Sequence, residues 1–425
     1  MTFAIILIAL LMLVCGFEML LVLGVPAFLT KTFMFTRIPD PVLIQKLVGG
    51  INFSTLLAIP FFIFAAELMA SGQIAKRLTD LIKYFTGHRL GGIGHTTIFG
   101  SMAFGSVSGS APATVAAMGK LMYPELRKTG FSEKFSLGLI ISSAETALLI
   151  PPSITLIIYG WMTGTSITGL FIGGLGVGVT LGLAFGALVI FESLRKGVGR
   201  GKKTTEPFFT VFKSAAWALG LPVIILGGIY SGLFTPTEAA AVSVVYAILI
   251  EAFVYKNLSF SRLISITEQA AISTTIIFIL LAMGSVLSYF VTLAQVPVLI
   301  TDFLTNIQAG PITFLMIVNI AFFLAGMFID PNSALLILVP PLYPVALTMG
   351  IDPIHFGEIV CLNICIGMIT PPFGLDIFVA SSTLDKPVMS IINGVWPFLF
   401  INILVLILIT YVPGVATFLP NLIAP

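Results

Sequence analysis

Residues 103–119 read AFGSVSGSAPATVAAMG and interrupt a chain that is otherwise mostly apolar. An apolar run that begins near Ile98 gives way here to glycines and serines and then to Pro112. The flanking segments 92–104 and 111–122 are each shorter than the roughly 20 residues that cross a bilayer. The stretch therefore predicts a turn at membrane depth, with the chain entering and leaving on one side of the membrane.

The composition places this turn in a membrane protein. Of 425 residues, 58% are hydrophobic and only 9% are charged, whereas a soluble chain carries about 25% charged residues. We therefore expect an all-α polytopic membrane protein. The net charge of +2, without a basic or acidic tail, argues against a nucleic-acid partner. The sequence holds no P-loop and no G-x-G-x-x-G after a strand, so we expect no nucleotide cofactor.

Two local features support the same class. Cys15, Cys361 and Cys365 lie in apolar helical sequence without metal-ligand spacing, so we expect small buried residues outside any disulfide or zinc site. The first residues, MTFAIILIALLMLVCGF, lack a basic region and a small-residue cleavage site. We therefore expect a retained membrane segment, with residues 3–36 forming one span or two.

Segments of the first half of the chain recur in the second half at a constant spacing. LMYPELRKTGFSEKFSLG (121–138) aligns with PLYPVALTMGIDPIHFGE (341–358), so that a Tyr-Pro pair and a glycine recur. At the same spacing LIPPSITLIIYG (149–160) aligns with ITPPFGLDIFVA (369–380), and Pro-Pro falls on Pro-Pro. Several matches in one register predict two structural repeats.

Basic residues indicate that the two copies have opposite orientations. Residues 70–134 carry eight Lys and Arg, whereas residues 290–354 carry none. Basic residues mark cytoplasmic loops, so the loops of the first copy face the cytoplasm and those of the second face outward. An odd number of expected spans between the copies agrees with an inverted-topology repeat. In this topology three basic residues lie outside: Lys31, Arg37 and Lys46.

Each copy is expected to contain a re-entrant helical hairpin and a helix broken by Pro-Pro. The first hairpin has its tip at Ser106–Ser110, and the second has its tip at GMFIDPNSA (326–334). Non-helical backbone at membrane depth is tolerated only where protein or a water-filled cavity satisfies it. Tips and breaks of this kind therefore line a site. Their free carbonyl and hydroxyl oxygens suit a hard cation such as Na⁺, and the helix N-termini suit a carboxylate.

We divide the candidate site residues into two cation sites and one substrate site. The first Na⁺ site comprises Gly105, Ser106, Ser108, Ser110, Glu145, Ile150 and Pro151. The second Na⁺ site comprises Gly326, Asp330, Asn332, Met368, Thr370 and Pro371. The substrate site comprises Ser108, Gly109, Ser153, Thr155, Phe373, Gly374 and Asp376. No Lys or Arg lies near the breaks, so a substrate anion would depend on helix dipoles, hydroxyls and bound cations.

Several of these residues also have a purely structural interpretation. Asp330 precedes Pro331 and would serve as a helix N-cap, as would Ser110 before Pro112. Glu238 in TPTEAA (235–240) has the spacing of a capping box. Glu145 would support a cation or act as a hydrogen-bonded structural acid, and Asp376 would contact substrate or act as a cap. The three histidines, at positions 88, 95 and 355, lie in or beside loops and are not expected to be catalytic.

Amphipathic helices are expected to connect each hairpin to the rest of the chain. QIAKRLTDLIKYF (73–85) places Ile74, Leu78, Leu81, Ile82 and Phe85 on one stripe. We expect such arms to link moving hairpins to a fixed frame. The frame would comprise 1–70, 167–193, 214–291 and 389–412, and the hairpins and broken spans would move together.

These elements give the expected domain organisation. We expect scaffold in 1–46, repeat 1 in 47–193, a cytoplasmic loop with connecting helices in 194–268, repeat 2 in 269–412 and a tail in 413–425. Repeat 1 holds arm 73–87, hairpin 92–122 and broken helix 134–161. Repeat 2 holds arm 292–308, hairpin 311–347 and broken helix 356–383.

The motifs GSVSGSAPATVAAMG, YPELRKTGFS, LIPPSITLIIYG, FTPTEAAAV, LAGMFIDPNSALLILVP and ITPPFGLDIFVASS resemble the large membrane subunit of tripartite ATP-independent periplasmic (TRAP) transporters. The resemblance covers nearly the whole chain. It implies a multi-pass protein of the bacterial inner membrane with an elevator-type, ion-transporter-like architecture. It also implies Na⁺-coupled uptake of an organic acid, a separate small membrane subunit of about four helices, and a periplasmic substrate-binding protein.

The resemblance is greatest to sialic-acid transporters, although C4-dicarboxylate carriers share the motifs. Asp376 departs from the family pattern, in which Asn is usual at this place in PPFGLD. Two other functional classes are weighed against transport by a carrier. An intramembrane hydrolase would need a His or Lys base within the helices, and none is placed there. An ion channel would use re-entrant hairpins, but an inverted repeat within one chain fits alternating access better.

Overall fold

The computed structural model describes residues 8, 11–12, 15–201 and 206–423. Within these residues every regular element is a helix. Seven helical segments are long and apolar enough to cross a membrane: Ser54–Ser71, Ile167–Lys196, Phe208–Tyr230, Pro236–Val254, Phe260–Leu293, Pro331–Thr348 and Val388–Tyr411. The chain therefore has the all-α polytopic architecture expected from its composition.

Most of the helices form two series that follow each other in the same order. The first series is α5 (Ile74–Thr86), α6 (Gly92–Ser108), α7 (Ala111–Lys128), α8 (Glu133–Ala144), α9 (Ile154–Thr163) and α10 (Ile167–Lys196). The second is α15 (Val296–Asn306), α16 (Pro311–Gly326), α17 (Pro331–Thr348), α18 (Pro353–Met368), α19 (Leu375–Leu384) and α20 (Val388–Tyr411). Local sequence determines where several of these helices begin. Ser or Asp N-caps precede α7, α8, α17 and α18, and prolines lie in the first turn of α7, α17 and α18.

The repeat extends further toward the N-terminus than the motifs indicated. At the spacing of the sequence repeat, the start of α14 (Phe260–Leu293) corresponds to the start of α3 (Asp40–Ile51). In the first copy this length is divided into α3, a 3₁₀ turn at Ser54–Leu57 and α4 (Ala58–Ser71). The copies thus begin near positions 40 and 260 rather than 47 and 269. The first copy is interrupted between α3 and α4, whereas α14 of the second copy is continuous. This difference explains why the two sequences do not reveal that these segments correspond.

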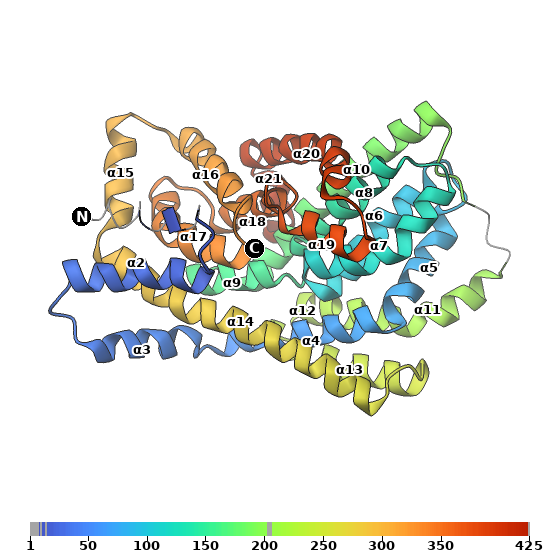
Figure 1. Cartoon of the computed structure of the whole chain (residues 1–425), viewed down its shortest axis with the longest axis horizontal. Coiled ribbons are helices and arrows are strands. Elements are labelled where there is room, and N and C mark those ends of the chain that lie inside the picture. The colour runs from blue at the N-terminus through green and yellow to red at the C-terminus, as the bar shows by residue number, and fades with distance from the viewer. Residues whose placement is uncertain (1–7, 9–10, 13–14, 202–205, 424–425) are drawn as a thin grey trace.

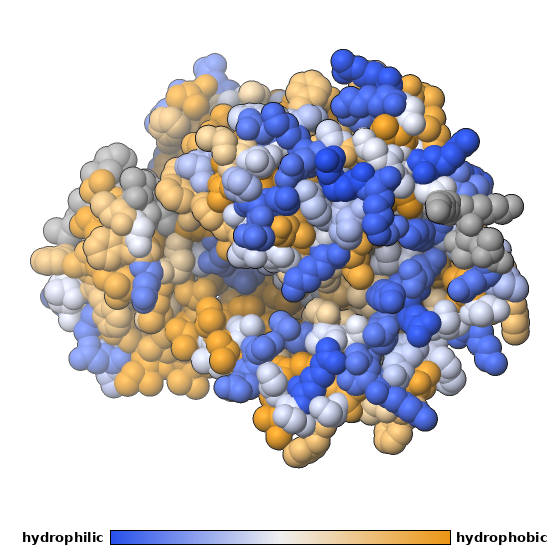
Figure 2. Space-filling view, turned by 45° about the vertical axis from the view of Figure 1, so that its right-hand side comes forward, coloured by the Kyte–Doolittle hydropathy of each residue, from blue (hydrophilic) through white to orange (hydrophobic). Residues whose placement is uncertain are grey.

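The two copies are inverted relative to each other. Arms α5 and α15 lie at opposite ends of the molecule, and the α6–α7 and α16–α17 hairpins lie toward those respective ends (Figure 1). Figure 2 brings the α5 end forward and shows hydrophilic residues spread over it. This agrees with the basic residues of the first copy, which mark the cytoplasmic end.

The hairpin arms are longer than the segments 92–104 and 111–122. Helix α6 has 17 residues and α7 has 18, so each is about 26 Å long. Shortness is therefore not the reason that the chain turns back. The reversal comes from the two residues between α6 and α7, where Gly109 adopts the left-handed conformation at φ 57° and ends the helix.

The remaining helices complete the fold and correct two expectations. They are α2 (Met19–Met34), α11 (Phe208–Pro222), which continues through a π-helical turn (Val223–Gly227) into α12 (Gly228–Tyr230), α13 (Pro236–Leu249) and α21 (Gly414–Ile423). The expected tail 413–425 thus contains a packed helix in its described part, because α21 contacts α10 at Gly173. Cys15 is exposed, not buried, whereas Cys361 and Cys365 are buried as expected. The number of spans before residue 46 depends on residues outside those described.

Packing assigns α10 and α20 to the same body as the hairpins, contrary to the expected scaffold. A Cβ on Gly138 of α8 would overlap the carbonyl oxygen of Gly394 in α20. The Phe398 ring of α20 also lies 5.2 Å from Phe135 of α8 and 5.7 Å from Phe185 of α10. These close contacts pack α8, α10 and α20 together in one body. We call α6–α10 and α16–α20 the bundle, and α2–α4 and α11–α14 the scaffold.

Arm α5 joins the scaffold to the bundle through polar contacts at both ends. The Glu251 carboxylate, at the end of the α13 span, accepts hydrogen bonds from the backbone N–H groups of Gln73 (2.7 Å) and Ile74 (3.2 Å). Lys83 near the other end pairs with Glu125 of α7 at 2.6 Å, and this hydrogen bond lowers the pKa of Glu125. The predicted apolar stripe is buried at Ile74, Leu78 and Leu81, but Phe85 is exposed.

Candidate functional site

The first hairpin tip is shorter than the sequence indicated. Helix α6 continues through Ser106 and Ser108, so the non-helical tip consists of Gly109 and Ser110. Ser110 caps α7 by accepting a hydrogen bond from the backbone N–H of Ala113 at 3.4 Å. The Ser106 hydroxyl donates to the carbonyl oxygen of Ala103 at 2.8 Å and thus stays within its own helix.

The first hairpin rests directly on the first helix break. After α8 the chain forms a 3₁₀ turn at Glu145–Leu148 and then a non-helical turn up to Ser153. Ser153 caps α9 by accepting a hydrogen bond from the N–H of Leu156 at 3.2 Å. A Cβ on Gly109 would lie 2.5 Å from the Pro152 carbonyl oxygen. A Cβ on Gly105 would lie 2.7 Å from the Ala147 Cα. Glycine at both positions therefore permits the hairpin to contact the unwound backbone.

The second hairpin has a longer, charged tip. Helix α16 ends at Gly326 and α17 begins at Pro331, which leaves Met327–Asp330 between them. Asp330 Oδ1 accepts hydrogen bonds from the N–H groups of Asn332 (3.0 Å) and Ser333 (3.2 Å), and Oδ2 accepts from the Ser333 hydroxyl (2.5 Å). Asp330 is therefore an N-cap, as its structural interpretation required. A carboxylate oxygen has lone pairs left for a cation after such bonds.

The second break follows α18 and again contacts its hairpin. The chain leaves helical geometry after Met368 and resumes it at Leu375. A Cβ on Gly326 of α16 would lie 2.9 Å from the Gly367 Cα. Thr370 donates to the Ile366 carbonyl oxygen at 2.6 Å. The ring of Phe373 is exposed and lies 5.8 Å from the Phe328 ring of the tip.

Both tips and the helix ends beside both breaks line one cavity between bundle and scaffold, which we call the inner cavity. Its volume is about 200 Å³. Seven of the predicted site residues line it: Ser108, Gly109, Ser110, Thr155, Asp330, Asn332 and Met368. The scaffold wall comes from α4 and α14, with Glu67 and Ser273 as its polar residues. Figure 2, in which the α5 end is turned toward the viewer, shows the surface hollowed between an upper and a lower part of the molecule.

The other predicted residues do not line this cavity. They are Gly105, Ser106, Glu145, Ile150, Pro151, Ser153, Gly326, Thr370, Pro371, Phe373, Gly374 and Asp376. Glu145 is fully buried and accepts a hydrogen bond from the Asn402 amide at 2.9 Å, which supports its interpretation as a structural acid. Asp376 is also fully buried, and its carboxylate has no hydrogen-bond partner among the described residues. Glu145 and Asp376 are therefore buried away from the inner cavity.

Sequence reasoning missed Glu67. It lies in AIPFFIFAAELMAS, the sequence of α4, which is otherwise apolar. The signal was present, because an ionisable residue within a membrane span is expensive and usually functional. No helix break marks this position, because α4 is unbroken around Glu67.

The charged residues in the described lining of the inner cavity are all acidic. Glu67 and Asp330 are the acidic residues of its described lining, and that lining includes no Lys or Arg. An organic anion entering this space would meet negative charge and little compensating positive charge. Bound cations are the simplest source of compensation, since carboxylate, hydroxyl and backbone oxygens are the ligands that hard cations prefer.

Comparison with known proteins identifies the family. The family described as "Tripartite ATP-independent periplasmic transporter, DctM component" matches residues 5–415. The ectoine TRAP transporter large permease protein TeaC of Halomonas elongata is 40% identical, covering 97% of both chains. The C4-dicarboxylate TRAP transporter large permease protein DctM of Pseudomonas aeruginosa is 38% identical over 90% of both chains. The sialic acid TRAP transporter large permease protein SiaM of Vibrio cholerae is 37% identical over 89% of both chains.

A solved structure supports the fold independently. The crystal structure of the Alcanivorax borkumensis YdaH transporter, described as having an unusual topology, matches with a TM-score of 0.63. The alignment covers 88% of each chain at 12% sequence identity. At this identity the likeness bears on the fold alone.

Proposed function

Because this chain belongs to the DctM component family of tripartite ATP-independent periplasmic transporters, we propose that it carries an organic acid across the membrane together with Na⁺. One observation carries the proposal. The tips of both inverted hairpins and the helix ends that flank both breaks line a single cavity. This cavity lies where the bundle meets the scaffold, a boundary that we call the seam. A site reached from both sides by inverted elements is what alternating access requires.

The charge of the inner cavity supports coupling to a cation. With Glu67 and Asp330 in its lining and no basic residue there, the cavity holds an organic anion stably only when cations accompany it. We propose that one Na⁺ binds between the first tip and the Ile150–Ser153 break. The other would bind near Asp330, Asn332 and the Met368–Pro371 break. The anion would then be held between two bound cations and the helix N-termini.

The polarity of the seam supports an elevator-type movement of the bundle. Nearly all described hydrogen bonds and ion pairs lie within the bundle, within the scaffold or at arm α5. A side-chain hydrogen bond does cross the seam, from the Tyr230 hydroxyl to the Phe171 carbonyl oxygen at 3.2 Å. The contact between Gly284 of α14 and Leu336 of α17 on the same seam is apolar. Such a surface slides without breaking a polar network.

The substrate class is narrowed by the size of the cavity. The relatives carry names for three substrates, namely ectoine, C4-dicarboxylates and sialic acid. A volume of about 200 Å³ is below the roughly 300–1,000 Å³ of sites for drug-sized ligands. This favours a small carboxylate over the bulkier sialic acid, which the motifs favoured. We propose a small organic acid and keep sialic acid as the alternative to be tested.

The family also supplies the expected partners and location. We propose that the chain functions in the bacterial inner membrane with a separate small membrane subunit and a periplasmic binding protein that delivers the acid. The relatives are named as permeases, which supports transport rather than enzymatic chemistry.

Uptake by the reconstituted complex tests the proposal. Large and small subunits in liposomes, with the binding protein outside, would be given ectoine, succinate or sialic acid in Na⁺ or K⁺ buffer. We expect saturable uptake of one acid that requires both a Na⁺ gradient and the binding protein. Uptake that is equal in K⁺ would contradict Na⁺ coupling, and ion flux without any acid would indicate a channel.

A further inference from the structure

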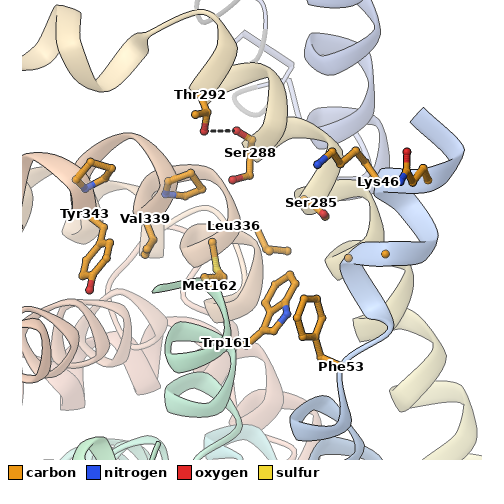
Figure 3. A pocket seen from close by; sticks show the side chains of 16 residues that line it. Lys46, Phe53, Trp161, Met162, Ser285, Ser288, Thr292, Leu336, Val339 and Tyr343 are labelled. Carbon is orange, nitrogen blue, oxygen red and sulfur yellow. Dashed lines mark hydrogen bonds between the residues drawn. The ribbon is translucent and has the colours of Figure 1, made fainter. Parts of the chain in front are cut away.

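A second and larger cavity lies on the same seam, toward the outer end of the molecule. This outer cavity has a volume of about 520 Å³ and is bounded by α3 and α14 of the scaffold and by α9 and α17 of the bundle. Figure 3 shows the side chains that line it, with α3 on one side and α17 on the other. None of the candidate residues predicted from the sequence lines it.

The outer cavity continues the path of the inner one. Ile277 of α14 lines the inner cavity and Gly284, two helical turns further on, lines the outer cavity, which separates them by about 10 Å along the helix. Phe53 and Ser273, which occupy equivalent positions in the two copies of the repeat, line the outer and inner cavities respectively. Phe53 packs edge-on against Trp161 at 6.1 Å, and Figure 3 shows both rings together at one end of the space.

The charge of the outer cavity is opposite to that of the inner cavity. Lys46 of α3 is the one charged residue in its described lining. Its ammonium lies 4.6 Å from the centre of the Tyr289 ring and points toward the space between α3 and α17 (Figure 3). The ring holds the ammonium in place by a cation–π interaction. The Lys46 side chain has no ion-pair partner among the described residues.

Neutral hydrogen-bond donors surround the lysine. The hydroxyls of Ser285 and Ser288 face this cavity from α14 (Figure 3), and the hydrogen bonds described for the chain do not engage either hydroxyl. A carboxylate accepts hydrogen bonds from hydroxyls and from an ammonium at the same time. Gly49 and Gly50 leave the side of α3 that lines the cavity without side chains. Gly50 also packs closely against Ser285, because a Cβ there would lie 2.3 Å from the Ser285 Cβ. The cavity is therefore a positively charged pocket with free donors.

We propose that the outer cavity is a capture site for the carboxylate of the incoming acid, centred on Lys46 and independent of Na⁺. Lys46 and the hydroxyls of Ser285 and Ser288 bind the anion before it reaches the inner cavity, and the Phe53–Trp161 contact separates the two spaces. This rests on the proposed transport of an organic acid and adds a second site for it. A lysine that served only to anchor the outer membrane interface would extend into the headgroups, whereas Lys46 points into the cavity.

Thiol labelling of the reconstituted complex tests the electrostatic part without any substrate. Ser288→Cys, in a Cys15→Ser background, would react with an anionic reagent (sulfonatoethyl methanethiosulfonate) and a cationic one (trimethylammonioethyl methanethiosulfonate). Lys46→Gln should lower the anionic-to-cationic rate ratio about tenfold, because one nearby charge acts on both reagents in opposite directions. Lys46→Arg should keep the ratio. Lys31→Gln is the matched control, since Lys31 lies in α2, pairs with Asp40 and does not line the cavity.

Uptake measurements test the effect of the capture site on transport. Lys46→Gln should raise KM for the transported acid about fivefold and leave kcat and the Na⁺ dependence unchanged, while Lys46→Arg restores KM. An unchanged labelling ratio in Lys46→Gln overturns the capture site, as does an unchanged KM. If the unmodified complex takes up none of the three acids, the proposed function fails, and the labelling ratio still decides whether the outer cavity attracts anions.

Discussion

The outer and inner cavities lie on one seam but offer an anion opposite surroundings. The outer cavity is the larger, at about 520 Å³ against 200 Å³, and its charged residue is Lys46. The inner cavity holds Glu67 and Asp330 and no basic residue in its described lining. On the two proposals above, an acid would enter the outer cavity alone but would need cations in the inner one. On this account, Na⁺ coupling arises from the difference in charge between the two spaces.

The largest effect should come from preventing movement between the two cavities. Gly284→Cys with Leu336→Cys would place a disulfide between α14 and α17, because a Cβ on Gly284 lies 3.0 Å from the Leu336 Cβ. Oxidation should abolish uptake, and reduction should restore it. Helix α14 is the scaffold helix that meets α17 at this contact.

A crosslink within the bundle is the control for that experiment. The hydroxyls of Ser101 in α6 and Ser143 in α8 are 3.4 Å apart, so Ser101→Cys with Ser143→Cys joins two helices of one body. Uptake should survive this crosslink. If the bundle crosslink stops transport and the seam crosslink does not, the hairpins gate locally and the bundle does not slide.

A smaller effect is expected from removing the charge of Asp330. Asp330→Asn keeps an N-cap residue but removes a negative charge from the inner cavity, so the Na⁺ concentration for half-maximal uptake should rise about tenfold. Asp352 is the matched control, because it caps α18 ahead of a proline in the same way, accepting from Ile354 and His355 at 2.9 Å. It does not line the inner cavity. Equal Na⁺ responses in Asp330→Asn and Asp352→Asn would show that Asp330 serves only as a helix N-cap and does not bind Na⁺.

The smallest effect is expected outside both cavities, at the Lys83–Glu125 pair. Lys83→Gln should lower the stability of the folded subunit by less than about 1 kcal/mol, because both side chains are about 30% exposed. The Glu125 pKa is lowered in the fold, so the pair contributes above the ordinary Glu pKa and its contribution disappears as pH falls through the lowered value. Thermal unfolding of the unmodified chain and of Lys83→Gln at pH 7 and pH 4 measures the stability that the pair contributes at each pH. A loss that is larger at pH 4 than at pH 7 would contradict it.

Helix starts and reversals could be predicted from the sequence because short-range chemistry sets them. Prolines and Ser or Asp caps mark the starts of α7, α17 and α18, and Pro-Pro pairs mark the breaks. The predicted bounds of the first hairpin tip were less accurate, since Ser106 and Ser108 belong to helix α6. Their hydroxyls are satisfied by neighbouring groups of the same hairpin, so serine content alone did not locate the turn.

The division into bundle and scaffold could not be predicted in the same way. Helices α10 and α20 have the length and composition of ordinary spans, and their place in the bundle depends on long-range contacts such as Gly138 with Gly394. The inner cavity was predicted through its tips but not through Glu67, and the outer cavity was missed. Both omissions concern residues in uninterrupted helices, whose role depends on which surfaces face each other.

Substrate protection at two cysteines tests the central claim most directly. Ser288→Cys reports on the outer cavity and Ala113→Cys on the inner one, and both residues line their cavities. The acid identified by the uptake screen would be added in Na⁺ or in K⁺, and the labelling rate of each cysteine would be measured in the reconstituted complex. We predict protection of Ser288→Cys in both buffers and protection of Ala113→Cys only in Na⁺. The same Na⁺ dependence at both positions would contradict the account.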